Sequence, residues 1–323
     1  MQIQTPVLGI DIAKRKVDVV LLHAQRELHR VFANDAEGFA KLIAWLEPIA
    51  LADLHACMEA TGHYGEPLAR FLFTAGATVS VVNPARIRAF ARSELKRNKT
   101  DKVDAGCIAR FCATQRPTAW RPASPELRTL QRLVHCLQEL VQERVRTKNR
   151  INDEVEPAAR VYWERLQAFV EEQIKTIKAE IKAFFGNHPE LAEQHRLLTT
   201  IPAIGEMTAL ALLTQVPDWA QFTSARKVVA FAGLNPSEYS SGTSVRGKPR
   251  ISRMGSARLR FQLYMPAVVA LTRNPITKAM AERMPANGKP SMVIVVAIMR
   301  KLLHLAYGVL KTGKPFDPMH AAA

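Results

Sequence analysis

The first apolar run of the chain contains an acid, and this feature constrains the fold more than any other. Residues 7–13 read VLGIDIA, which is typical of a buried β-strand and is interrupted only by Asp11. Burying an unpaired carboxylate costs on the order of several kcal/mol. A metal ion or a neighbouring cation would remove that cost. The run therefore predicts a strand that carries a charged site.

The residues that follow predict a small sheet with alternating helices. Two further strands, 17–23 and 27–32, are joined by a polar turn and complete an antiparallel meander. Residues 35–49 have the apolar spacing of an amphipathic helix. A fourth strand, 54–60, is apolar like the first and again ends near an acid, Glu59. A helix at 67–75, a strand at 77–82 and a helix after Pro84 complete the pattern.

A third acidic motif, NKTDKVDA at 98–105, reads as a helix start. Asp101 and Asp104 are three residues apart, so a helix places both carboxylates on one face. The alternative is an ordinary solvated helix end, with Thr100 or Asn98 as N-cap and Asp101 facing the helix dipole. Cations that could contact phosphates surround the acidic motifs: Lys14, Arg86, Arg88, Arg92, Lys96, Arg97, Lys99 and Lys102.

The three motifs can converge if the first and fourth strands are neighbours in a mixed sheet. Asp11 and Glu59 would then meet near the carboxyl ends of their strands. A helix across that edge would add Asp101 and Asp104. Carboxylates this close cannot all stay ionised without a cation between them. Mg²⁺, which takes oxygen ligands and keeps positions open for phosphate oxygens, would supply it.

The charge balance indicates a polyanionic partner. The 323 residues include 45 Lys and Arg against 29 Asp and Glu, a formal charge of +16. Such an excess favours nucleic acid or an anionic membrane surface. No run of about 18 apolar residues predicts a spanning helix, and the N-terminus has no signal-peptide pattern. The four cysteines lack CxxC spacing and lie in apolar-periodic segments, which predicts buried free thiols in a reducing cytoplasm.

The pattern changes after Pro117 to two long helices. Leucines at 130, 133, 137 and 140 repeat at 3-4-3 spacing, and a second apolar stripe runs from Trp163 to Phe184. This spacing predicts the seam of an antiparallel helical hairpin or coiled coil. The alternative is a single stripe that packs on its own domain.

Two C-terminal stretches suggest contact with a nucleic-acid backbone. Residues 198–209, LTTIPAIGEMTA, have the form of a helix-hairpin-helix, in which Gly205 frees backbone N–H groups for a phosphate. Residues 240–253 are rich in Ser and Gly, and a flexible linker would look similar. The spacing of the Lys and Arg residues favours contact with backbone phosphates instead. A serine hydroxyl among such cations can act as a nucleophile. The cations in and after this stretch are Arg246, Lys248, Arg250, Arg253, Arg258 and Arg260.

Together, the motifs around Asp11, Glu59 and the Asp101/Asp104 pair resemble the DEDD signature of a RuvC-like, RNase H-type domain. The set is similar to that of transposases of the insertion-sequence family numbered one-ten, over essentially the whole chain. The fold expected is α/β plus all-α: a mixed-sheet domain at 1–120, a coiled-coil hairpin at 121–190, and a mainly helical transposase domain with a helix-hairpin-helix-like element at 191–323.

The resemblance implies a DNA recombinase of the bacterial cytoplasm, associated with the nucleoid. It maps the nucleophilic serine onto Ser241, with Ser240 and Ser244 close enough to leave the choice open. It also implies a structured noncoding bridge RNA that pairs with target and donor DNA, and a homo-oligomer, a dimer that becomes a tetramer in the synaptic complex. Two rivals remain: a junction-resolving nuclease that uses water as its nucleophile, and a non-catalytic nucleic-acid scaffold.

Overall fold

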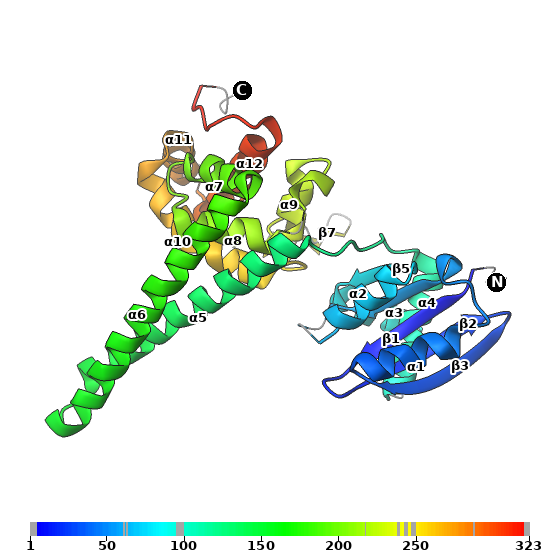
Figure 1. Cartoon of the computed structure of the whole chain (residues 1–323). Helices are drawn as coiled ribbons and strands as arrows, with labels where there is room; N and C mark the ends of the chain where they lie inside the picture. Colours follow the sequence, from blue (N-terminus) through cyan, green and yellow to red (C-terminus); the bar gives the residue numbers. More distant parts are fainter. Residues whose placement is uncertain are drawn as a thin grey trace. The chain divides into compact units, whose positions relative to one another are not determined.

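The computed structural model divides into two compact units, residues 1–122 and 123–323 (Figure 1). It describes residues 5–60, 62, 64–94, 100–216, 218–237, 240–241, 245–246, 250–286 and 288–319. The three-part division expected from the sequence stays a prediction.

The first unit is built on a mixed five-stranded sheet with the order β3-β2-β1-β4-β5. The strands are β1 (Val7–Ile12), β2 (Lys16–His23), β3 (Arg26–Ala33), β4 (His55–Glu59) and β5 (Thr78–Val82). β1, β2 and β3 pair antiparallel, whereas β4 runs parallel to both β1 and β5. The predicted meander and the predicted pairing of the first and fourth strands are both confirmed.

Helices cover both faces of this sheet (Figure 1). α1 (Ala36–Leu46) and α2 (Glu66–Thr74) pack on one face. α3 (Pro84–Ser93) and α4 (Asp101–Gln115) pack on the other, where residues such as Val20 and Cys57 form the core. Because side chains alternate along a strand, even positions of β2 and odd positions of β1 and β4 point toward α4. A short 3₁₀ turn, η1 (Leu51–Asp53), precedes β4.

Gly9 allows α4 to lie directly against β1. A Cβ atom at this position would overlap the Ala105 carbonyl oxygen and the Ala109 backbone nitrogen. Ala105 and Ala109 are themselves fully buried and small. The backbones of α4 and β1 are therefore in direct contact at Gly9. This contact fixes the position of α4 along β1, two residues before Asp11.

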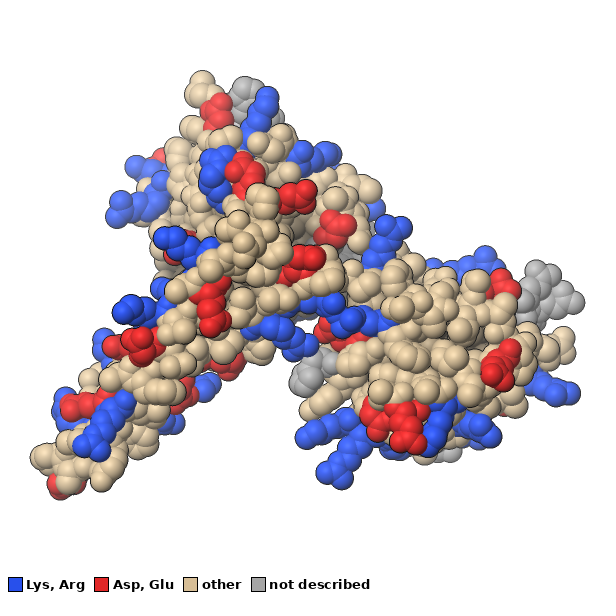
Figure 2. Space-filling view, in the orientation of Figure 1, with Lys and Arg blue, Asp and Glu red and all other residues tan. Residues whose placement is uncertain are grey.

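The second unit begins with the hairpin of α5 (Pro125–Asp153) and α6 (Pro157–Asn187), side by side in Figure 1. Their contact is a core of aliphatic side chains that includes Leu130, Leu137, Ile174 and Ile181. Figure 2 shows basic and acidic side chains interleaved along the outer surface of both helices. The predicted helical hairpin is present, and its assignment as a coiled coil stays a prediction.

The remaining helices of this unit form one body with α12 (Ser291–Thr312). They are α7 (Pro189–Thr199), α8 (Glu206–Gln215), η2 (Trp219–Gln221), α9 (Ala225–Phe231), α10 (Ala257–Arg273) and α11 (Pro275–Ala286). α12 packs against all of them but α8, which packs instead on α5, α7 and α10. α12 is long and apolar enough to cross a membrane by length and composition. A core helix meets the same test, and Ile298, Leu302 and Ala306 are fully buried against the neighbouring helices.

A ribbon of short strands leaves the helical body between α9 and α10. β6 (Pro236–Ser237) pairs with β9 (Arg250–Ile251), and β7 (Ser240–Ser241) pairs with β8 (Val245–Arg246), both antiparallel. The base of the ribbon is tight, because a Cβ on Gly255 would overlap the Phe231 carbonyl oxygen and the Gly233 nitrogen. Gly233 itself has φ +69°, which a side chain would disfavour.

The prediction that all four cysteines are buried is wrong for one of them. Cys57, Cys107 and Cys112 are buried in the first unit, whereas Cys136 is exposed on α5. Leu130, Val134 and Leu137 occupy the buried stripe of this helix. Cys136 lies outside that stripe because it is two residues past Val134, about 200° around the helix.

The contact at Gly9 makes a direct prediction about stability. Replacing Gly9 by Ala forces α4 away from β1, and we expect the free energy of unfolding to fall by about 3 kcal/mol, the upper range for an overpacked core. Thermal unfolding of the full chain, followed by circular dichroism, measures this change.

Gly186→Ala is the matched control, because the added methyl group at this exposed position of α6 meets no atom within 4 Å. This variant should match the wild type or be slightly more stable, since Ala favours a helix over Gly. Equal midpoints for Gly9→Ala and the wild type would contradict the close packing of α4 on β1.

Candidate active site

The carboxyl ends of β1 and β4 bring the first two acidic motifs together. The parallel register pairs Gly9 with Cys57 and Ile10 with Met58, so Asp11 and Glu59 are the next residues along the two strands. Both side chains point to the α4 side of the sheet, since they share the parity of Gly9 and Cys57. Adjacent parallel strands thus place two acids at one edge, as the sequence predicted.

α4 adds the third motif to the same edge. Its N-cap is Thr100, whose hydroxyl accepts a hydrogen bond from the Val103 N–H at 3.3 Å. Asp101 and Asp104 lie in the first turn, immediately before the residues that cross Gly9. The helix end is therefore both capped, as the ordinary interpretation expects, and directed at the sheet edge that holds Asp11.

Asp11 is surrounded by negative charge from three other carboxylates. Burial raises its pKa above the ordinary value, and the charges of neighbouring carboxylates raise it further. The neighbours that act on it are Asp104, Asp101 and Asp18, in decreasing order. Each of these charges disfavours the ionised form of Asp11. The arrangement accumulates negative charge that a cation would stabilise.

Asp18, Lys16 and His29 belong to this edge and were missed by the sequence analysis. Asp18 lies directly across from Asp11 in the β1–β2 register. It is buried and receives the Lys16 Nζ at 3.0 Å and the His29 Nε2 at 3.0 Å. Lys16 Nζ also donates to Asp101 Oδ2 at 2.6 Å. The sequence could have indicated these residues, because Lys16 and Asp18 are two positions apart in a strand and therefore point to the same face, the one that α4 covers.

The pKa values agree with this bridge. The hydrogen bond and charge of Lys16 lower the pKa of Asp101, and the two carboxylates raise the pKa of Lys16. Among the described residues, no group of three or more His, Cys, Asp or Glu side chains is arranged as a ligand shell for a metal ion. The donor set nevertheless fits a hard divalent cation, since it consists of carboxylate oxygens, crowds Asp11 and already holds an ammonium group.

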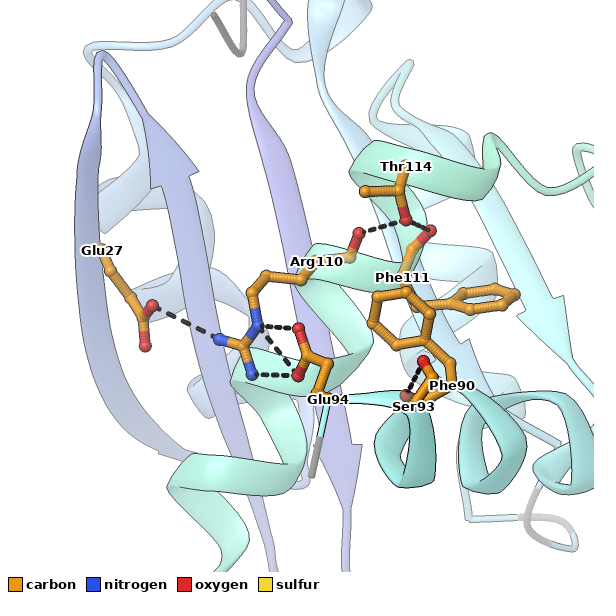
Figure 3. Close-up of polar contacts among 7 residues, drawn as sticks. All are labelled: Glu27, Phe90, Ser93, Glu94, Arg110, Phe111 and Thr114. Carbon is orange, nitrogen blue, oxygen red and sulfur yellow. Dashed lines mark hydrogen bonds and ion pairs between the residues drawn. The ribbon is translucent and has the colours of Figure 1, made fainter. Parts of the chain in front are cut away.

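Arg110 ties α4 to its surroundings through two acidic residues, Glu94 and Glu27 (Figure 3). Its Nε donates to Glu94 Oε1 at 2.8 Å and its Nη2 to Glu94 Oε2 at 3.1 Å, while Nη1 lies 3.5 Å from Glu27 Oε2. Glu94 directly follows α3, and Glu27 belongs to β3. One guanidinium thus links α4, the end of α3 and the outer strand.

The predicted phosphate-contacting cations of the first unit divide into two groups. Arg86, Arg88, Arg92, Lys14 and Lys102 are exposed. Arg86 also stacks over the Phe111 ring at 5.2 Å, and Arg88 Nε bonds the Pro84 carbonyl within its own helix at 3.4 Å. Lys96, Arg97 and Lys99 lie outside the described residues.

The predicted nucleophile lies in the ribbon of the second unit. The backbone of Ser241 pairs with Val245, and that of Ser240 with Arg246. The side chains of Ser240, Ser241 and Arg246, together with all of Ser244 and Lys248, lie outside what the structure describes. Arg250 and Arg253 are exposed near the base of the ribbon, where Arg253 adopts φ +54°.

Arg258 and Arg260 make contacts within the fold. Arg258 Nη2 donates to Gln138 Oε1 at 2.6 Å and contacts His135 Nδ1 at 2.9 Å, which joins α10 to α5. Arg260 Nη1 donates to the carbonyls of Ala232 and Gly255 at 3.0 and 3.1 Å, and burial lowers its pKa. Both guanidinium groups therefore stabilise the base from which the ribbon extends.

Gly205 is the N-cap of α8 and follows the turn after α7. Its φ of −83° lies in an ordinary region, and a Cβ added there would meet nothing within 4 Å. The fold therefore does not require glycine at this position. Glu206 places a negative charge in the first turn of α8, which disfavours a phosphate there.

Comparisons with known proteins agree with this architecture. A family model for the DEDD domain of IS110, described as a transposase, matches residues 8–156. A second, described as the transposase IS116/IS110/IS902 family, matches residues 195–282. The first match contains all four acids, and the second contains the ribbon with Ser241.

Similar proteins extend over nearly the whole chain. The pilin gene-inverting protein of Moraxella bovis is 34% identical over 96% of this chain and 97% of its own length. The corresponding protein of Moraxella lacunata is also 34% identical with the same coverage. The transposase for insertion sequence element IS1328 of Yersinia enterocolitica is 27% identical over 96% of this chain and 98% of its own length.

A mixed sheet with acids at the ends of adjacent strands, followed by a helical transposase region, defines a DNA transposase of the DEDD type. The chain belongs to the IS110 family of transposases. It is accordingly an enzyme that cleaves and rejoins DNA.

The Arg110 contacts predict a substantial structural role. Arg110→Gln removes the paired charged donors to the half-buried Glu94 carboxylate, so the free energy of unfolding should fall by about 1–3 kcal/mol. Arg160→Gln is the control, because it removes an exposed i,i+4 pair with Glu164 at 3.0 Å. That change should stay under about 0.5 kcal/mol. Equal losses in denaturant titrations of the two variants would contradict the role of Arg110.

Proposed function

We propose that this transposase breaks and rejoins DNA strands with two chemical centres, the acids of the first unit and a serine of the ribbon. Asp11, Glu59, Asp101 and Asp104 would hold the divalent metal, Mg²⁺ in this proposal. When bound, the metal neutralises charge on the scissile phosphate and polarises its P–O bonds. The crowding of negative charge around Asp11 is the observation that carries this part.

Ser241 would supply the nucleophile. Its Oγ forms a bond to phosphorus while the bond from phosphorus to one deoxyribose oxygen breaks, and the hydroxyl proton leaves as the released sugar oxygen gains one. The resulting phosphoserine ester keeps a phosphodiester linkage, so a second sugar hydroxyl can reverse the exchange and rejoin the strand without an energy-rich cofactor. The chemistry requires that both centres act on one phosphate.

The remaining parts would bind and align the nucleic acid. The formal charge of +16 and the exposed arginines of α3 favour backbone contacts that carry no sequence information. Arg250, Arg253 and the N-terminus of α8 at Gly205 would extend these contacts in the second unit. We place the catalytic region at 1–120, a coiled-coil hairpin that joins protomers at 121–190, and the serine-bearing region at 191–323.

Sequence selection would come from a partner RNA. The family resemblance favours a structured bridge RNA that pairs with target and donor DNA, and a homo-oligomer that assembles a dimer and then a tetramer at synapsis. Base pairing carries the sequence information in other RNA-guided systems. The names of the relatives, a gene-inverting protein and a transposase for an insertion element, support rearrangement of DNA segments. We place this activity in the bacterial cytoplasm.

Substitution of the two centres separates this mechanism from its closest rival. Ser241→Ala should abolish the covalent protein–DNA adduct and strand joining, because no other group would form the ester. Asp11→Asn should abolish cleavage that depends on Mg²⁺. Denaturing gels with end-labelled DNA detect both the adduct and the cut strand.

Ser240→Ala and Ser244→Ala are the matched controls and should keep the adduct. Continued cleavage by Ser241→Ala without any adduct would identify a nuclease that uses water, and would overturn the serine mechanism. Cleavage that persists in Asp11→Asn at the wild-type rate would overturn the role of the acids.

The RNA partner has its own test. Protein purified from cells that carry the flanking DNA of its element should contain one discrete RNA species, because specific folding and binding protect a single transcript. Sequencing of the co-purified nucleic acid measures this. A heterogeneous mixture that matches total cellular RNA would contradict a dedicated guide.

A further inference from the structure

Lys16 places a cation directly at the candidate metal site. Its Nζ lies 2.6 Å from Asp101 Oδ2 and 3.0 Å from Asp18 Oδ2. The two partners differ in environment, because the Asp18 side chain is only 7% exposed and that of Asp101 is 54% exposed. The buried Asp18 carboxylate therefore holds the Lys16 ammonium group, which also contacts the exposed Asp101 carboxylate.

The sheet explains why a cation is needed there. Asp18 lies opposite Asp11 in the antiparallel register, and like charges at such positions destabilise a strand pair. His29 Nε2 contacts one oxygen of Asp18 at 3.0 Å, and Lys16 contacts the other. These contacts fix the Asp18 carboxylate, and Asp18 in turn holds the ammonium group beside Asp101.

We propose that Lys16 is an internal counter-ion that competes with the divalent metal for Asp101. The inference rests on the proposed metal site. Without the metal, the Asp101 carboxylate accepts a hydrogen bond from Lys16. With the metal, the same carboxylate would be a metal ligand, and a fixed ammonium group nearby repels a divalent ion. Metal binding then exchanges one cation for another at Asp101, while Asp18 keeps Lys16.

Metal affinity provides the test, independent of DNA cleavage. Mg²⁺ is titrated by calorimetry into the full-length protein, free of nucleic acid and at low ionic strength. Lys16→Met should bind Mg²⁺ roughly five- to tenfold more tightly than the wild type, because the competing charge is gone. Its metal-free form should unfold at a lower temperature, since Asp18 and Asp101 lose the ammonium group that bridges them.

Three variants separate charge from other effects. Lys16→Arg keeps the cation and should retain the weaker affinity of the wild type. Lys16→Gln keeps an N–H donor without the charge, and replaces Lys16→Met if that variant does not fold. Lys41→Met is the matched control, because Lys41 makes an equally short contact with Glu37, 2.7 Å, on α1 away from the site. It should leave the metal affinity unchanged.

The dependence of the metal affinity on ionic strength provides a second test. The affinity gain of Lys16→Met should shrink as ionic strength rises, because the contact between Lys16 and Asp101 is exposed and therefore screened. A gain that is independent of salt would indicate a change in shape rather than charge, and would overturn the proposal.

The outcomes distinguish this inference from the function on which it rests. Wild-type binding that is lost in Asp11→Asn, together with unchanged or weaker binding in Lys16→Met, would overturn the role of Lys16 and leave the metal site intact. Absence of Mg²⁺ binding in the wild type and in all variants would overturn both.

Discussion

The first unit of this protein depends on the contact between the backbones of β1 and α4 at Gly9. The lack of a side chain there lets Ala105 and Ala109 reach the strand directly. Because α4 is rigid, this contact fixes its first turn, with Asp101 and Asp104, beside the end of β1. Arg110 also secures the helix, through Glu94 and Glu27. Steric fit and an ion-pair cluster together place residues that are about ninety positions apart in the chain.

The same edge of the sheet combines strong negative charge with a fixed positive one. The pKa of Asp11 is raised by burial and by three neighbouring carboxylates, whereas the pKa of Asp101 is lowered by Lys16. A site that gathers acids for a divalent ion must remain stable when the ion is absent. Lys16, held by the buried Asp18, offers a physical solution that uses a residue of the same strand pair.

The second unit shows how an overall basic composition is divided among different tasks. Arg258 and Arg260 lie within the basic segment around the ribbon, yet their guanidinium groups bond to side chains and carbonyls of the helical body. Together with Gly233 and Gly255 they define where the ribbon with Ser241 leaves that body. Arg250 and Arg253 stay exposed. A family relationship that extends over the whole chain gives this division a functional setting, since both units belong to one DNA-rearranging enzyme.

The sequence by itself indicated the strands of the first unit and the long helices, and it offered the adjacency of Asp11 and Glu59 as a condition on strand pairing. Alternation, helical spacing and caps such as Thr100 are local properties, whereas the sequence allowed the pairing of the first and fourth strands without requiring it. Only the tertiary structure decided that Asp18 and Lys16 share the edge with the acids, because that depends on the register of β1 against β2. It also decided that the Arg260 guanidinium group donates to backbone carbonyls and that the Cys136 side chain is exposed. Sequence patterns indicate which residues lie on one face of a helix or strand. The ion-pair partner of a charged side chain is decided only when several helices and strands pack together.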